Sequence, residues 1–341
     1  MDSADIDLAA KLAEPLLYFP IYTGPFEFRA GLRRLVIDAG TTGPHDLVFQ
    51  FDSQWPIYRL TKLQSRQEHF EKYVCEARLT QETASNTAAW LLSELATKHP
   101  RLFRLELSRH HRQLQCHLTN ETLVFDQRMK LIDVIDNGNR PEYRNALDAL
   151  CCQIQEDLAI VHVGKKEDSI AYLHLCLPNY WASQDKIGRD FVNAHTPVPG
   201  MKKIMARARR LVDMLAGDGP FERFTWGLTT DARLNHHPVV PHDQDPHQWQ
   251  GRNFDPVHQQ LYLRIERQVT VAIPGCRAFL FTIRTYLRDI WTLTNIECRR
   301  LLQAITTMPE DVQTYKGLTG QREAIINWLN QRLHSKSRHP G

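Results

Sequence analysis

The sequence lacks the segments that direct proteins into or through membranes. No run of apolar residues approaches the roughly 18 that a membrane-spanning helix requires. The opening residues MDSADIDLAAKLAEP are acidic and lack the basic start and apolar stretch of a secretory signal. We therefore expect a cytoplasmic protein that does not associate with a membrane.

Paired cysteine motifs are absent too. The seven cysteines form neither C-x-x-C nor C-x-x-C-H, which argues against a zinc ribbon and against covalently attached haem. Their odd number argues against a complete disulfide framework and favours a reducing compartment. A strong net charge is also missing, since 42 Lys and Arg nearly balance 39 Asp and Glu to give +3. We therefore expect no nucleic-acid partner.

The common nucleotide and hydrolase motifs do not occur. The chain has no G-x-G-x-x-G, no P-loop, no G-x-S-x-G and no H-E-x-x-H. Their absence disfavours a protein that binds its own dinucleotide, hydrolyses nucleoside triphosphates or uses a serine nucleophile elbow. If the chain is a redox enzyme, its electrons come from another protein.

The apolar periodicity predicts an α+β fold in which helices flank an antiparallel sheet, because no βαβ alternation is present. The predicted helices cover 60–77, 81–98, 142–157, 201–215 and 320–333, together with one that begins at a capping box of Thr294 and Glu297. The predicted strands cover 102–107, 113–118, 122–126, 158–163, 169–177, 261–272 and 278–287.

The last two predicted strands carry a row of polar side chains. The row consists of Arg264, Glu266, Gln268, Arg284 and Tyr286. A turn with an odd number of residues would place Glu266 opposite Arg284, and Arg264 opposite Tyr286, on one face of the sheet. This face could line a pocket, or it could be a solvated outer face with a cross-strand ion pair.

His195 stands in the segment AHTPVPG, where the two following prolines stiffen the chain. A neutral imidazole presented by a rigid segment is a good ligand for haem iron or another metal. A histidine that hydrogen-bonds a loop is the commoner arrangement, and the residue alone favours it.

Three other polar segments are expected to be ordinary surface. The segment 235–258 holds five histidines without a recognised zinc spacing, which indicates a mobile surface loop. His69 and Glu71 have the spacing of an iron-binding pair but lie in a charge-dense helix. The run KKIMARARR is typical of a basic surface helix.

Several segments together resemble the haem-dependent oxidative N-demethylase alpha-subunit-like family. They are GPFEFRAGLRRL (24–35), QEDLAIV (155–161), LCLPNYWASQDKIGRDFVNAHTPVPG (175–200), LRIERQVTVAIP (263–274), LFTIRTYL (280–287) and TYKGL (314–318). They occur in the family's order, and the resemblance spans roughly 17–330.

The resemblance implies a PAS-like antiparallel sheet core with helical additions at both ends. It implies one haem-binding domain over 1–335, followed by a disordered tail over 336–341. A b-type haem would serve a monooxygenase component that uses O2 to convert a secondary amine, such as dimethylamine, to a primary amine and formaldehyde. Electrons would come from separate reductase subunits that carry NAD(P)H-linked FMN and an iron–sulfur cluster. A PAS-like haem sensor or carrier without turnover is the alternative, a haem-free interaction module is a third, and a homo-oligomer is a further candidate assembly.

The resemblance also assigns roles to individual residues. His195 matches the family's I-H-x-P-V-P histidine and is the expected axial iron ligand, with His174 as the fallback. Trp181, Lys186 and Gly188 match the W-x(4)-K-x-G spacing, so Trp181 would wall the haem pocket and Lys186 would meet a propionate. Glu266 and Tyr286 match the ERQ and FTIRTY motifs and would relay protons or hold the amine. The candidates for pairing with propionates or for orienting Glu266 are Arg264, Arg267 and Arg284.

Two positions depart from the family's pattern. The family's usual C-F-P-S is Cys176-Leu-Pro-Asn179 here, and its usual Asn-Trp is Thr225-Trp226. We expect these exchanges to reshape the pocket and to change the preferred amine.

Overall fold

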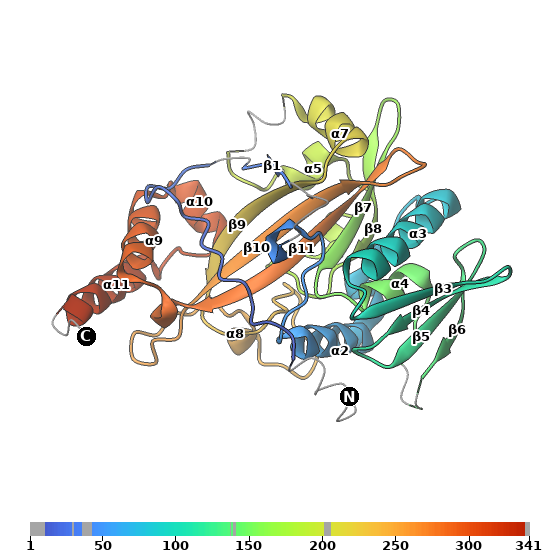
Figure 1. Cartoon of the computed structure of the whole chain (residues 1–341). Coiled ribbons are helices and arrows are strands. Elements are labelled where there is room, and N and C mark those ends of the chain that lie inside the picture. The colour runs from blue at the N-terminus through green and yellow to red at the C-terminus, as the bar shows by residue number, and fades with distance from the viewer. Residues whose placement is uncertain are drawn as a thin grey trace.

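The computed structural model describes residues 11–28, 31–35, 43–136, 138, 141–200 and 206–337. Two antiparallel sheets with surrounding helices confirm the α+β class (Figure 1). In spatial order the large sheet contains β1 (Arg33–Arg34), β9 (Phe221–Thr229), β10 (Tyr262–Ala272), β11 (Ala278–Asp289), β7 (Asp157–Val163), β8 (Asp168–His174) and β2 (Val74–Glu76). The small sheet contains β3 (Phe103–Leu107), β4 (His111–Cys116), β5 (Glu121–Asp126) and β6 (Leu131–Ile135).

The helices lie around the large sheet and at both ends of the molecule (Figure 1). They are α2 (Trp55–Tyr73), α3 (Gln81–Lys98), α4 (Ala146–Cys151), α5 (Phe191–His195), α7 (Ala208–Gly217), α8 (Pro246–Trp249), α9 (Asn295–Thr307), α10 (Glu310–Tyr315) and α11 (Arg322–Ser337). Figure 1 shows α9 to α11 at one end of the molecule, and α3, α4 and the small sheet at the other. None of the described helices is long and apolar enough to cross a bilayer.

Most predicted elements are present, with shifted ends. The predicted helix 81–98 matches α3, where the Thr80 hydroxyl caps the helix by accepting from the Thr83 amide at 3.1 Å. The capping box of Thr294 and Glu297 is confirmed at the start of α9. The predicted helix 142–157 is wrong in length, because α4 begins after its Asn145 cap and the chain then turns into β7.

The ends of two further predictions meet residues outside the described ranges. The predicted helix 201–215 is α7, which begins at Ala208, and 201–205 lie outside the described residues. Helix α11 continues to Ser337 and therefore covers the first two residues of the predicted tail, while 338–341 lie outside the described residues. The strands β1, β2, β6 and β9 were not predicted, and the predicted helix 60–77 is wrong at its end, because α2 ends at Tyr73 and β2 follows it.

The register of β10 and β11 differs from the prediction by one residue. Glu266 pairs with Thr285, and Ile265 pairs with Tyr286. The two strands close around an even turn, in which the Ile273 amide donates to the Ala278 carbonyl at 2.9 Å. Paired residues share a face of the sheet, so the predicted polar row is split. Glu266 lies on one face, and Tyr286 lies on the other.

The prediction was wrong because both faces of these two strands are buried. Strand β10 is buried at almost every position, which includes the side chains of Arg264 and Arg267 on opposite faces. The rule that places polar residues outside and apolar residues inside applies to a sheet with one solvated face. It therefore gives no information on the register here.

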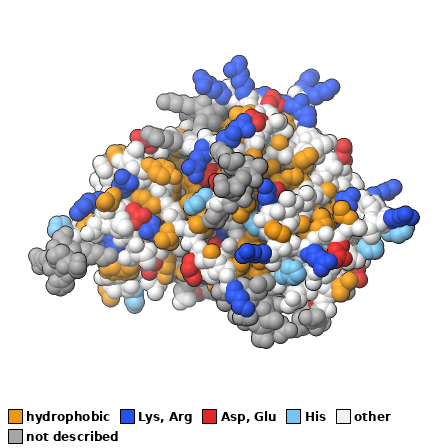
Figure 2. Space-filling view, viewed as in Figure 1, with side chains coloured by type: hydrophobic (Ala, Val, Ile, Leu, Met, Phe, Trp, Pro, Cys, Tyr) orange, Lys and Arg blue, Asp and Glu red, His pale blue; other side chains and the backbone are white. Residues whose placement is uncertain are grey.

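One apolar core joins the two sheets. Ile160, Val269 and Leu280 of the large sheet belong to the same buried cluster as Leu114 and Leu123 of the small sheet. A second cluster joins β10 to the C-terminal helices. The outer surface is mixed in charge, and Figure 2 shows basic and acidic side chains interspersed over one face.

The segment 235–258 is not a mobile surface loop throughout. The exposed fractions of His236 and His237 are 1% and 2%. The His236 ring stacks on Tyr180 with 5.1 Å between ring centroids, and its Nε2 contacts Asp231 at 2.9 Å. Aromatic stacking and a carboxylate partner thus bury a histidine that the polar composition placed in solvent.

Charged pairs are buried between α2 and α4. The Arg66 guanidinium donates to both carboxylate oxygens of Asp148, each at 2.7 Å, and the Asp148 side chain is fully buried. Such bidentate pairs are strong only while both partners are present.

We expect Asp148→Asn to destabilise the fold by about 3–5 kcal/mol, because it leaves the buried Arg66 charge without its counter-charge. Chemical denaturation followed by circular dichroism would measure the loss. The control is Glu71→Gln, which removes an ion pair with Arg144 whose side chains are 60% and 55% exposed. It should leave the unfolding midpoint unchanged. Equal midpoints for the two variants would contradict the structural role of the Asp148 charge.

Candidate ligand-binding cavity

A cavity of about 900 Å³ covers the face of the large sheet that carries Glu266. This volume lies near the upper end of the range for small-molecule and cofactor sites. Its walls come from the N-terminal residues 20–28 and 31–33, the segment 179–199 with α5, helix α7, and the residues around α10. The cavity is therefore built from segments that are far apart in the sequence.

The strand order divides the floor of the cavity into two halves. The apolar half comes from β11 and β7, where Phe281 pairs with Ala159 and Phe279 pairs with Val161. The polar half comes from β10 and β9, where Glu266 pairs with Thr225 and Gln268 pairs with Arg223. A ligand with a broad apolar part and a polar end matches this division.

His195 lies on the cavity wall at the end of the short helix α5. Its Nδ1 contacts the Phe191 carbonyl at 2.7 Å, and because a carbonyl only accepts, Nδ1 must carry the proton. The lone pair is then on Nε2, which is the tautomer that a metal-ligating histidine needs. Burial lowers the pKa of His195 to about 4, and nearby Lys186 adds to this effect.

Trp181 and Lys186 line the same wall as His195. The Lys186 Nζ donates to the Ala194 carbonyl and lies 6.0 Å from the centre of the Trp181 ring. Gly188 has a φ of +74°, and its amide donates to the Ile170 carbonyl at 2.8 Å. Because this conformation favours glycine, the spacing of Trp, Lys, Gly and His reflects a local turn that gathers three of these side chains at one wall.

Glu266 lies in the polar half of the cavity with both carboxylate oxygens held. The Asn179 amide donates to Oε1, and the Gln268 amide donates to Oε2, each at 2.9 Å. The side chain is 6% exposed. The two amide donors fix the orientation of the Glu266 carboxylate at the cavity.

The lining of this cavity, as far as the structure describes it, does not include four other predicted site residues. They are Arg264, Arg267, Arg284 and Tyr286. Tyr286 lies on the opposite face of the sheet and donates to the Gln50 side chain. Arg284 binds Asp52 at 2.6 Å, and Arg267 donates to the Leu47 carbonyl at 2.7 Å.

These arginines hold chain segments against the sheet. Arg264 shares the face of Glu266, but its guanidinium donates to the carbonyls of Leu177 and Leu234 at 2.8 and 3.0 Å. Arg264 therefore fixes two loops beside the cavity, while Arg267 and Arg284 fix the segment 45–52 before α2. The predicted cluster of these arginines around one site is not what the structure shows.

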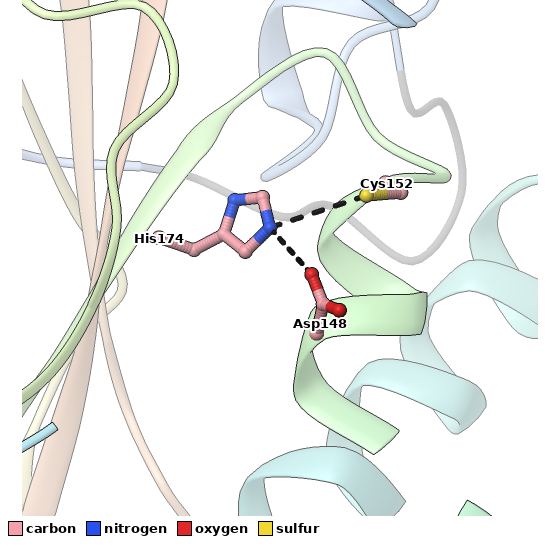
Figure 3. A group of neighbouring side chains, drawn as sticks. All are labelled: Asp148, Cys152 and His174. Carbon is pink, nitrogen blue, oxygen red and sulfur yellow. Dashed lines mark hydrogen bonds and ion pairs between the residues drawn. The ribbon is translucent and has the colours of Figure 1, made fainter. Parts of the chain in front are cut away.

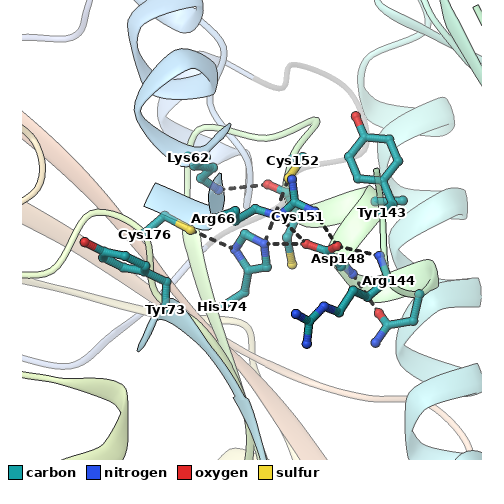
Figure 4. Close-up of polar contacts among 12 residues, drawn as sticks. Lys62, Arg66, Tyr73, Tyr143, Arg144, Asp148, Cys151, Cys152, His174 and Cys176 are labelled. Carbon is teal, nitrogen blue, oxygen red and sulfur yellow. Dashed lines mark hydrogen bonds and ion pairs between the residues drawn. The ribbon is translucent and has the colours of Figure 1, made fainter. Parts of the chain in front are cut away.

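His174 is also placed away from the cavity, in the network drawn in Figures 3 and 4. It is fully buried, and its Nε2 donates to Asp148 Oδ1 at 3.1 Å. Its Nδ1 lies 3.7 Å from the Cys176 sulfur, so the thiol donates to it. Burial lowers the pKa of His174 to about 4. Both ring nitrogens are used within the core.

The same network contains the described groups with metal-ligand spacing. They are Asp148 with Cys152 and His174, and Asp157 with His174 and Cys176. The cationic side chains of Lys62 and Arg66 lie beside them, and Asp148 already accepts from Arg66 through both oxygens. Burial raises the pKa of the Cys152 thiol to about 11. The cluster is therefore a satisfied hydrogen-bond network of the core.

Several residues of the polar half were not anticipated from the sequence as site residues. They are Arg223, Arg252, Lys316 and Tyr180. Arg223 lies on β9, whose alternation of large and polar residues was a usable signal. Arg252 lies in the segment that was expected to be a surface loop, and Lys316 lies in the TYKGL motif without a role assigned to it.

The structure is an α+β fold with a large, partly apolar cavity that carries a neutral histidine on its wall. The chain belongs to the family described as haem-dependent oxidative N-demethylase, alpha subunit-like, whose model matches residues 41–326. This confirms the resemblance found in the sequence. At the level of the family, the description indicates dependence on haem, an oxidative N-demethylation activity and an assembly of more than one subunit.

We expect His195 to stay neutral far below pH 6.5, because its pKa in the folded protein is lowered to about 4. Nitrogen NMR of the haem-free protein should show a protonated Nδ1 and an unprotonated Nε2 down to about pH 5, with His195→Gln identifying the signals. The unfolded chain takes up this proton near its ordinary value of 6.5, so His195 should also lower stability as the pH falls from 6.5 toward 4. A doubly protonated ring at pH 6 would contradict the assigned tautomer.

Proposed function

We propose that the chain is the haem-binding component of an oxidative N-demethylase that acts on a secondary amine with O2. The observation that carries the proposal is the position of His195, a neutral imidazole with its lone pair on Nε2, on the wall of a cavity with an apolar floor. The polar end of the same cavity, with Glu266, offers a site for a cationic amine.

The residues present fit a b-type haem. The apolar half of the floor, with Phe279 and Phe281, suits a macrocycle, and His195 offers an axial nitrogen. Trp181 would form a wall of the haem pocket, and Lys186 would meet a propionate. When bound, the haem would supply the activation of O2. A PAS-like core within one domain over 1–335 is part of the proposal and is supported by the antiparallel sheet and the core shared by both sheets.

Glu266 is proposed as the residue that holds the substrate ammonium and accepts a proton from it. Its carboxylate is oriented by Asn179 and Gln268, which have no proton to exchange near neutral pH. The proposal includes no contact between Tyr286 and the substrate, because Tyr286 lies on the face of the sheet opposite Glu266.

The overall reaction fixes what the partners must provide. A secondary amine, O2, two electrons and two protons give a primary amine, formaldehyde and water. We propose that the electrons come from a separate flavin and iron–sulfur reductase that uses NAD(P)H, since the sequence has no G-x-G-x-x-G motif of its own.

The absorption spectrum of the purified protein tests the cofactor. Haem-loaded protein should show a Soret band that shifts on reduction with dithionite and again with CO. We expect His195→Ala to lower haem affinity by about tenfold or more and to change the Soret position. His69→Ala, at an exposed position on α2, is the control and should bind haem normally. A His195→Ala spectrum identical to that of the wild type would exclude His195 as the ligand.

Formaldehyde release tests the role of Glu266. With haem, a reductase and a methylated amine, Glu266→Gln should reduce turnover about 10²- to 10⁴-fold without loss of haem. Glu106→Gln, at an exposed position on β3, should leave turnover unchanged. Full activity in Glu266→Gln would remove the residue from the mechanism. Haem binding without formaldehyde from any methylated amine would favour a haem sensor or carrier instead.

A further inference from the structure

The polar half of the cavity contains more positive charge than Glu266 can neutralise. Three cationic side chains, Arg223, Arg252 and Lys316, line it beside Glu266, while the other acidic residues of the cavity, Glu27 and Asp185, are exposed and lie on its walls. Buried or partly buried charges without counter-charges are costly, so proteins seldom gather them without a ligand. The excess of positive charge therefore needs an explanation.

Arg223 is the least satisfied of the three cations. It makes no hydrogen bond or ion pair with any described side chain, and its Nε is buried without a partner. Burial lowers the pKa of Arg223, and only the attraction of Glu266 and Tyr315 opposes this effect. A planar guanidinium with free donors at a cavity is suited to a carboxylate, which it can bind through two parallel hydrogen bonds.

Arg252 and Lys316 are held in place by their neighbours. The Arg252 guanidinium lies 3.3 Å from the centre of the Tyr180 ring, and its Nε is also buried without a partner. Gly317 leaves room for it, since a Cβ there would come within 2.5 Å of Arg252 Cδ.

The positive charges of Arg223 and Arg252 act on the Lys316 ammonium. Its Nζ donates to the Trp226 carbonyl and lies 4.9 Å from the centre of the Trp226 ring. Burial, together with the positive charges of Arg252 and Arg223, lowers the pKa of Lys316 to about 8, while Glu266 opposes this effect. An added negative charge beside these groups would stabilise all three.

We propose that this half of the cavity binds a zwitterion, with its carboxylate at Arg223, Arg252 and Lys316 and its ammonium at Glu266. The amine would then be an N-methylated amino acid and not a simple alkylamine. This inference rests on the proposed function, because it names the substrate class of the same site. The reaction would convert N-methylglycine, O2, two electrons and two protons to glycine, formaldehyde and water.

The spacing of the two charged sites suits such a ligand. Arg223 pairs with Gln268, and Thr225 pairs with Glu266, so Arg223 and Glu266 are diagonal neighbours on adjacent strands. Diagonal neighbours are about 7–8 Å apart, which side chains can bridge around a ligand whose charges are separated by one or two carbons. A haem propionate could also carry the carboxylate, but Glu266 beside it would repel a group with no ammonium.

Binding of two matched amines to the haem-loaded protein tests the proposal. N-methylglycine differs from dimethylamine only by a carboxylate on one methyl group, and N-methylglycinamide keeps the size but not the charge. Isothermal titration calorimetry should show N-methylglycine binding at least tenfold more tightly than either neutral-ended amine. If dimethylamine binds the wild-type protein as tightly as N-methylglycine or more tightly, the proposal is overturned without the need for a variant.

A variant of Arg223 tests where the carboxylate of N-methylglycine binds. Arg223→Gln should weaken N-methylglycine binding at least tenfold and leave dimethylamine binding unchanged, whereas Arg104→Gln, at an exposed position on β3, should change neither. Haem affinity is measured in parallel by titration with haemin. If Arg223→Gln weakens haem binding and not N-methylglycine binding, the carboxylate belongs to a propionate and the proposal fails.

The same measurements separate this inference from the proposed function. If N-methylglycine binds through Arg223 but no formaldehyde is released, the zwitterion site stands and the demethylase activity falls. If dimethylamine is demethylated and N-methylglycine is neither bound preferentially nor demethylated, the activity stands and the zwitterion site falls.

Discussion

The register between β10 and β11 is the constraint on which the site depends. A shift of one residue would exchange the two faces of β11 relative to β10. In the observed register Glu266 faces the cavity beside Thr225 and Thr285, while Tyr286 and Arg284 face Gln50 and Asp52 in the segment before α2. The register thus places Glu266 in the cavity and turns Arg284 and Tyr286 away from it, toward Asp52 and Gln50.

The opposite face of the sheet uses charge to hold the chain. Arg267 and Arg284 are almost fully buried, and they bind backbone carbonyls and Asp52 of the segment before α2. These contacts hold the segment before α2 against the face of the sheet opposite the cavity. Both faces of the sheet are therefore buried. On the cavity face, by contrast, Arg223 and Arg252 each keep a buried Nε without a hydrogen-bond partner.

The sequence predicted the helices and strands that have one clear apolar stripe, such as α3. The resemblance to the family singled out Trp181, Lys186 and His195, which the structure places in the lining of one cavity. It could not predict the register, because both faces of β10 are buried and alternation then carries no information. It also missed Arg252, which is brought to the cavity from a polar segment by its stacking on Tyr180. Long-range packing of this kind leaves no local pattern.

The contrast between His195 and His174 shows how the surroundings separate two similar residues. Burial lowers the pKa of both to about 4, so both are neutral imidazoles. His174 uses one nitrogen on Asp148 and the other on Cys176, and it completes a core network. The Nδ1 of His195 donates to the Phe191 carbonyl of its own helix, and the lone pair on Nε2 remains available at the cavity wall. The number of ring nitrogens already bonded, and not burial or pKa, therefore decides which histidine can serve as a ligand.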